Sequence, residues 1–171
     1  MQNKMQKKPW ILCLHGFRTS AEILKHVIGK TWPEAVLEKL DLHFLDAPFP
    51  ARGRSDVESI FGPPYFEWFQ FNVKPSFEEI KLGHHKLASS ESPVGCLSLH
   101  FIGEKCFLKE KGIFLLKSIV DPVVIHHPGG HTILKLDEKS LKTTLAFIEK
   151  IQKILSHDLW MKMKMKMKSG L

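Results

Sequence analysis

The fold of this chain is decided by the stretch PWILCLHG at residues 9–16, a continuous apolar run that ends in a histidine and a glycine. Such a run is typical of a strand that is buried on both faces of a parallel sheet. Directly after it, Thr19 or Ser20 can cap a helix that extends to about Gly29. A buried strand that leads into a helix is the unit from which α/β proteins are built, so this opening predicts that class.

Strands and helices continue to alternate along the chain. We expect further helices at residues 32–40, 107–118 and 137–155, and further strands at residues 42–45, 96–102 and 122–127. Residues 51–67 and 73–92 lack such periodicity and are rich in polar residues, glycine or proline, so we expect irregular structure there. The alternation predicts a three-layer α/β sandwich with a mostly parallel sheet.

The charge of the chain argues against nucleic acid as a partner. The formal net charge is +7, but seven of the 25 lysines and arginines lie at residues 1–8 and 162–168. The remaining 18 equal the 18 acidic residues, so the body between these two segments is formally neutral. A nucleic-acid-binding protein normally carries its basic stripe on the folded body.

Membrane insertion and secretion are not expected either. No stretch reaches the roughly 18 apolar residues of a membrane span, and the apolar run at residues 10–14 is shorter than the roughly 7–15 residues of a signal peptide. The three cysteines, Cys13, Cys96 and Cys106, are an odd number and are interpreted as reduced thiols. We therefore expect a protein of the cytoplasm, with the nucleus as a second compartment.

The chain divides into three parts. Residues 1–7 are a basic N-terminal tail, residues 8–157 are the domain, and residues 158–171 are a low-complexity Met/Lys tail. The tail contains the run WMKMKMKMK, whereas the domain contains no methionine. This change in composition predicts a disordered tail. An amphipathic strand or a weak contact with a membrane surface is the alternative.

Serine hydrolysis on an α/β sheet needs four parts in a set chain order. These are an oxyanion loop after an early strand, a serine on a sharp turn flanked by glycines, a carboxylate after a later strand, and a histidine after the last strand. LHGF at residues 14–17 leaves a strand just before a helix, so backbone N–H groups near Phe17 can face such a site. An ordinary glycine turn is the alternative.

The candidate histidine is His131, which follows the last expected strand and a Pro-Gly-Gly turn. This is the position of a general base, and a solvated loop histidine is the alternative. We expect no metal at His126, His127 and His131, because the turn prevents the i, i+4 pairing that zinc motifs use.

Several blocks of sequence resemble the FSH family of serine hydrolases, which includes the ovarian-cancer-associated serine hydrolase. The blocks are KPWILCLHGFRTS at 8–20, LDAPFP at 45–50, PPYFEWF at 63–69, SLHFIGE at 98–104, and HHP and GHT within 126–132. They occur in family order and cover residues 8–72 and 92–153. The resemblance implies the α/β-hydrolase fold and serine-dependent hydrolysis of carboxylic esters or related acyl compounds, without a cofactor or a metal.

The nucleophile of the family is missing from this chain. The family places a G-F-S-Q-G elbow between the block at 63–69 and the strand at 97–102, and no G-x-S-x-G occurs anywhere here. The interval is too short for an elbow strand, its helix and the next strand. We therefore predict an internal deletion around 73–92 and a sandwich truncated in its centre, with unpaired strand edges.

The acid of the family is also replaced. The family pattern has an aspartate two positions after Glu104, where this chain has Cys106. A neutral thiol does not hold the imidazole of His131 as a carboxylate would. Glu104 is a weaker substitute acid, and a structural or incidental role for Cys106 is favoured over a nucleophilic one.

Three functional interpretations follow, and whether the chain is an enzyme stays open among them. The favoured one is an inactive or impaired serine hydrolase family member of marginal stability that tends to aggregate. The second is an active hydrolase with an unrecognised nucleophile, such as Ser55 or a cysteine. The third is a non-catalytic protein that binds a small acyl or ester ligand among aromatic side chains. These aromatic residues are Phe61, Tyr65, Phe66, Trp68, Phe69 and Phe71.

Overall fold

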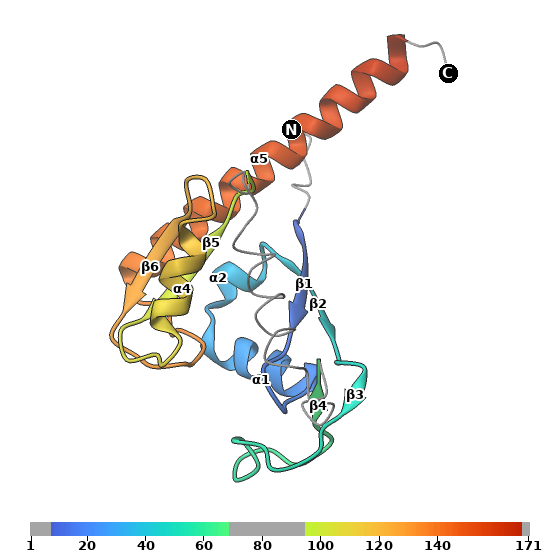
Figure 1. The fold of residues 1–171 in the computed structure, drawn as a ribbon. Coiled ribbons are helices and arrows are strands. Elements are labelled where there is room, and N and C mark those ends of the chain that lie inside the picture. Colours follow the sequence, from blue (N-terminus) through green and yellow to red (C-terminus); the bar gives the residue numbers. More distant parts are fainter. Residues whose placement is uncertain (1–7, 69–94, 169–171) are drawn as a thin grey trace.

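The computed structural model describes residues 8–68 and 95–168 (Figure 1). The predicted tail at 1–7 and the proposed deletion around 73–92 lie outside the described residues. The elements are β1 (Trp10–Leu14), α1 (Ala21–Thr31), α2 (Glu34–Leu37), β2 (Asp41–Leu45), β3 (Phe49–Pro50), β4 (Phe66–Glu67), β5 (Leu99–Gly103), α4 (Lys109–Leu116), β6 (Val123–His127) and α5 (Glu138–Lys168). The predicted mixed α/β class is confirmed.

The described strands form three two-stranded sheets. β1 pairs in parallel with β2, from Trp10 opposite Asp41 to Leu14 opposite Leu45. β5 pairs in parallel with β6, and the short strands β3 and β4 are antiparallel. Helices α1 and α2 connect the first parallel pair and α4 connects the second, because parallel neighbours need a crossover. Within 8–68 and 95–168, no hydrogen-bond ladder joins the two parallel pairs.

Helix α1 begins where the sequence offered two possible caps, and Ser20 is the cap that the chain uses. Its Oγ accepts the N–H of Ile23 at 3.3 Å. The Asp46 carboxylate, just beyond β2, accepts the N–H of Ala21 at 2.7 Å. Both acceptors satisfy amides of the first helical turn, which have no partner inside the helix. Asp46 therefore ties the start of α1 to the end of β2.

The expected burial of β1 on both faces is wrong. Trp10, Leu12 and Leu14 remain 60%, 47% and 55% exposed, whereas the alternate residues Ile11 and Cys13 are partly buried. Successive side chains of a strand point to opposite faces of the sheet. Helix α1 packs against β1 and β2, so the residues on the other face of this pair stay in contact with solvent.

The core lies between α2, α5 and the segment that follows β6. Val36 is fully buried, and Leu136 and Ile148 are nearly so. Burying one such side chain contributes roughly 1.5–3 kcal/mol. Partly buried apolar side chains surround these three: Trp32, Leu40, Phe101, Leu134, Leu141 and Leu145. Since α2 belongs to the first parallel pair and Phe101 to the second, this core joins the two pairs.

The Met/Lys segment is helical up to Lys168, so the prediction of a disordered tail is wrong for residues 158–168. Helix α5 starts at Glu138, close to the expected position, and continues as one long helix (Figure 1). Leucine, methionine and lysine are strong helix formers, and no glycine or proline occurs between Glu138 and Lys168. Among the described residues, no helix is long and apolar enough to cross a membrane.

Replacing Ile148 tests the importance of the core between α2 and α5. We expect Ile148→Ala to lower the free energy of unfolding by about 2–5 kcal/mol, because it leaves a cavity beside Val36 and Leu136. The matched control is Ile154→Ala on the same helix, where the side chain is 43% exposed and the expected change is within about 0.5 kcal/mol. Urea unfolding followed by circular dichroism measures both, and equal losses would contradict the assignment of the core.

Candidate functional site

The loop after β1 is organised by His15, a residue to which the sequence analysis assigned no role. The His15 ring is buried, and its Nε2 accepts the N–H of Ala47 at 3.0 Å. The proton of the neutral ring therefore resides on Nδ1, which lies 2.8 Å from the carbonyl oxygen of Gly16. The indole N–H of Trp68 donates to the carbonyl oxygen of His15 at 2.9 Å. These bonds attach the candidate oxyanion loop to the end of β2 and to the segment after β4.

The next residues of this loop are held by Arg18, which has a left-handed backbone (φ 49°). Its Nε donates to the buried carboxylate of Glu67 at 2.6 Å, and its guanidinium lies 4.6 Å above the centre of the Phe17 ring. A non-glycine residue in this region costs free energy, which the surrounding contacts must offset. The ion pair with Glu67 offsets part of this cost, because it holds the Arg18 side chain in a partly buried position.

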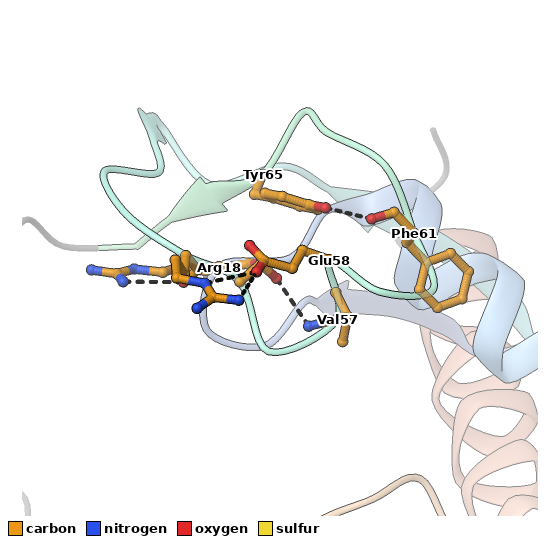
Figure 2. A network of polar contacts seen from close by, with 7 residues as sticks. Arg18, Val57, Glu58, Phe61 and Tyr65 are labelled. Atoms are coloured by element: carbon orange, nitrogen blue, oxygen red, sulfur yellow. Dashed lines mark hydrogen bonds and ion pairs between the residues drawn. The ribbon is translucent and has the colours of Figure 1, made fainter.

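Ser55 is only 4% exposed, and its hydroxyl contributes to the same network. Its Oγ–H donates to the carbonyl oxygen of Arg18 at 2.6 Å, and its Oγ accepts the N–H of Val57 at 3.3 Å. Figure 2 shows this network together with Glu58 and the hydrogen bond from the Tyr65 hydroxyl to the carbonyl of Phe61. The geometry favours a structural role for Ser55, which connects two loops, over the nucleophilic role considered for it.

The structure brings His131 and Cys106 together. The sulfur of Cys106 lies 3.2 Å from Nδ1 of His131, the ring nitrogen that a carboxylate contacts in a serine hydrolase triad. The same sulfur accepts the N–H of Leu108 at 3.4 Å. The ring of Phe107 lies 5.0 Å from the imidazole, measured between centroids. A thiol thus lies beside the ring nitrogen at which the resemblance to the family implies a carboxylate.

This contact depends on the absence of a side chain at Gly103, the last residue of β5. A Cβ atom there would lie 2.5 Å from the carbonyl oxygen of Gly130 and 2.8 Å from that of Gly129, which is closer than a Cβ atom approaches an oxygen to which it is not bonded. The loop after β6 is fastened in this position because Lys105 N–H donates to the carbonyl of Gly129 at 3.0 Å. Gly103 therefore lets the His131 loop close over the end of β5.

Glu104, the substitute acid considered above, is engaged elsewhere. Its carboxylate accepts from Lys109 Nζ at 2.6 Å and lies 2.9 Å from Nδ1 of His126. Hydrogen bonds from Lys109 and then His126 hold the pKa of Glu104 below its usual range. The structure therefore does not favour Glu104 as the partner of His131.

A pocket of about 450 Å³ lies between the loop after β1 and the loop after β6. Gly16 lies on one side, and Cys106 and His131 lie on the other. Its apolar lining includes Ile23, Leu24, Val27, Val57, Phe61 and Phe101. The described lining contains threonine hydroxyls but no serine.

The aromatic residues expected around an acyl ligand are mostly not at this pocket. Phe61 lines it, whereas Trp68 packs on the His15 ring with centroids 5.2 Å apart. The indole of Trp68 is thus used to hold the loop after β1. Phe66 also lies beside His15, at 6.4 Å. Tyr65 bonds to Phe61, and Phe69 and Phe71 lie outside the described residues.

Metal ligands do not gather in the part of the chain that the structure describes. No group of three or more His, Cys, Asp or Glu side chains is placed to hold an ion there. The histidines near the turn have other neighbours: His126 contacts Glu104, and Nδ1 of His127 accepts the N–H of Gly129 at 3.2 Å.

The strand, loop and helix at the start of the chain, with a pocket beside the loop, define a mixed α/β protein. Residues 5–89 match the model of the serine hydrolase (FSH1) family. The resemblance inferred from the sequence is thereby confirmed over β1 to β4, including the loop of His15 and Gly16. Cys106 and His131 lie beyond the matched residues. No curated protein and no solved structure matches the chain.

Replacing Gly103 tests the close approach of the two loops. We expect Gly103→Ala to destabilise the protein by about 1–3 kcal/mol, because the new methyl group must displace the backbone of Gly129 and Gly130. Thermal unfolding measures the effect. The control is Gly29→Ala in α1, where a Cβ meets nothing within 4 Å and the gain in helix propensity is about 0.5–1 kcal/mol. An unchanged melting temperature for Gly103→Ala would refute the close approach.

Proposed function

We propose that this chain is a serine hydrolase family protein that has lost serine-dependent hydrolysis of acyl esters. The family match supports a hydrolase origin. The observation that carries the proposed loss is the composition of the pocket, where Gly16 and His131 face the same space without a serine in the described lining. Removal of a serine nucleophile lowers the turnover number of a triad enzyme by about a millionfold.

The acid position gives the proposal a second support. In an active triad, a buried carboxylate sets the tautomer of the imidazole and stabilises its cation. Cys106 stands at 3.2 Å from Nδ1 of His131, and a neutral thiol supplies no negative charge there. Phe17, whose backbone N–H we propose as an oxyanion donor of the ancestral site, follows Gly16 in the loop on the opposite wall. The site is thus proposed to keep its base and its loop but not its nucleophile.

We further propose that the two parallel strand pairs are the remnants of one α/β-hydrolase sheet whose centre is missing. Two features support this: the pairs are separate within the described residues, and Trp10, Leu12 and Leu14 expose one face of β1. Exposed apolar faces and unpaired strand edges promote association. We therefore expect low stability and a tendency to aggregate.

A fluorophosphonate probe and a p-nitrophenyl ester test the loss of serine chemistry. We expect no serine to be labelled and no sustained ester turnover above the rate of uncatalysed hydrolysis in buffer, because the pocket offers no serine hydroxyl within the described residues. Mass spectrometry of tryptic peptides locates any label. Ser55→Ala is the control that separates the alternatives: labelling that Ser55→Ala abolishes would identify Ser55 as the nucleophile and overturn the proposal.

The pocket favours a second candidate function, the binding of an acyl ligand without hydrolysis. Its volume of about 450 Å³ lies in the range of small-molecule sites. The side chains of Ile23, Leu24 and Val27 form an apolar wall from α1, while the imidazole of His131 and the backbone of Gly16 offer polar contacts. This arrangement is suited to a short aliphatic chain that ends in a carbonyl group.

Thermal stabilisation by octanoate tests this second function. We expect the melting temperature to rise with octanoate concentration, since a ligand at 100 times its Kd stabilises a protein by about 2.7 kcal/mol. Leu24→Gln should reduce the shift by placing an amide in the apolar wall. Ile154→Gln on the exposed side of α5 should leave it unchanged. A shift that is absent in the wild type, or equal in both variants, would exclude binding in this pocket.

A further inference from the structure

The three cysteines lie in three different environments. Cys13 is a residue of β1, where burial raises the pKa of its thiol and its Sγ lies 3.8 Å from the carbonyl oxygen of Ile11. Cys96 is exposed and is the second residue of the described segment that begins at residue 95. Cys106 is partly buried, lines the pocket and contacts His131. This contrast supplies an internal comparison for thiol reactivity.

We propose that Cys106 and His131 form a nucleophilic thiol site, which accepts an acyl group from an activated ester that enters the pocket. A sulfur 3.2 Å from an imidazole nitrogen can pass its proton to the ring as it attacks. Both groups line the same pocket and Cys106 is only partly buried, so a carbonyl carbon that enters the pocket can reach the sulfur. The thiol of Cys106 is therefore the nucleophile of the proposed site.

The backbone beside Cys106 offers a hydrogen-bond donor to its sulfur. The N–H of Leu108 points at Sγ from 3.4 Å, and Leu108 is the N-cap of α4. The amides at the start of a helix carry partial positive charge, which favours the charge that develops on the sulfur as its proton leaves during the attack. The sulfur thus has a proton acceptor and an N–H donor within contact distance.

The acyl transfer can be written with its atoms and charges balanced. The sulfur attacks the carbonyl carbon of the ester, and the thiol proton moves to Nδ1 of His131. The bond between the carbonyl carbon and the leaving oxygen then breaks, and the alcohol or phenol departs with the proton from the imidazolium. A thioester at Cys106 and a neutral imidazole remain, so the step needs no oxidant and no metal.

The other titratable groups near this pair already have different contacts. The carboxylate of Glu104 is paired with Lys109 and His126. Nδ1 of His127, which also lines the pocket, accepts the N–H of Gly129. His131 is accordingly the imidazole that the structure places against the sulfur.

This inference goes beyond the proposed loss of serine chemistry and can fail separately from it. If Cys106 does not react, the absence of serine labelling and the binding of octanoate are unaffected. If a serine is labelled by the fluorophosphonate probe, the reactivity of Cys106 is still decided separately, by its rate of acetylation. The two outcomes are distinguished by the residue that carries the modification.

Acetylation by p-nitrophenyl acetate tests the thiol site in the full chain. We expect the protein to gain one acetyl group, located at Cys106 by peptide mapping, with a single equivalent of p-nitrophenol released in the first phase. At pH 7 the reaction at Cys106 should be about tenfold or more faster than at Cys96, because a positioned general base accelerates proton transfer. Acetylation that is no faster at Cys106 than at Cys96 would overturn the proposal.

Two variants test the part played by His131. We expect His131→Ala to slow acetylation of Cys106 by about tenfold or more at pH 7. The difference from the wild type should shrink above about pH 8.5, where an ordinary thiol ionises without a base. Cys96→Ser should leave the reaction at Cys106 unchanged. Unfolding of His131→Ala would reveal itself by acetylation of Cys13, and equal rates for folded His131→Ala and wild type would refute the role of His131.

Discussion

The packing of α5 against α2 is the interaction on which the rest of the described structure depends. Within 8–68 and 95–168 the two parallel strand pairs share no hydrogen-bond ladder, so side-chain packing must hold them in place. Val36 from α2 meets Leu136 and Ile148, and Phe101 of β5 packs against the same cluster. Because dispersion and burial act over short distances, this small core sets the relative position of the pairs.

The pocket inherits its shape from that packing. One wall comes from the loop after β1 and from α1, and the other comes from the ends of β5 and β6. Each wall is stiffened locally, the first by the buried ring of His15 and the second by the close contact at Gly103. A shift of either pair would therefore move Gly16 relative to His131 without breaking the local bonds of either wall.

The contact between Cys106 and His131 differs from the contact of the imidazole in a serine hydrolase triad. Next to a carboxylate, an imidazole is oriented for proton transfer with a serine. Next to Cys106, the same nitrogen faces a group that can itself give up a proton and attack a carbonyl carbon. The hydroxyl of Ser55, in contrast, donates a hydrogen bond to the carbonyl oxygen of Arg18 and has a structural role.

The sequence by itself determined the order and type of the longer elements and the family resemblance of the N-terminal part, because periodicity, caps and local motifs reside in neighbouring residues. It did not predict the short strands β3 and β4. It was wrong about the exposed face of β1 and the helical end of α5, since coverage by other elements and helix extension depend on the chain as a whole. Only the tertiary structure decided that His15 holds Ala47, that Ser55 is bound to Arg18, and that Cys106 meets His131. These contacts join segments far apart in the chain, and their distances follow from how the strand pairs pack.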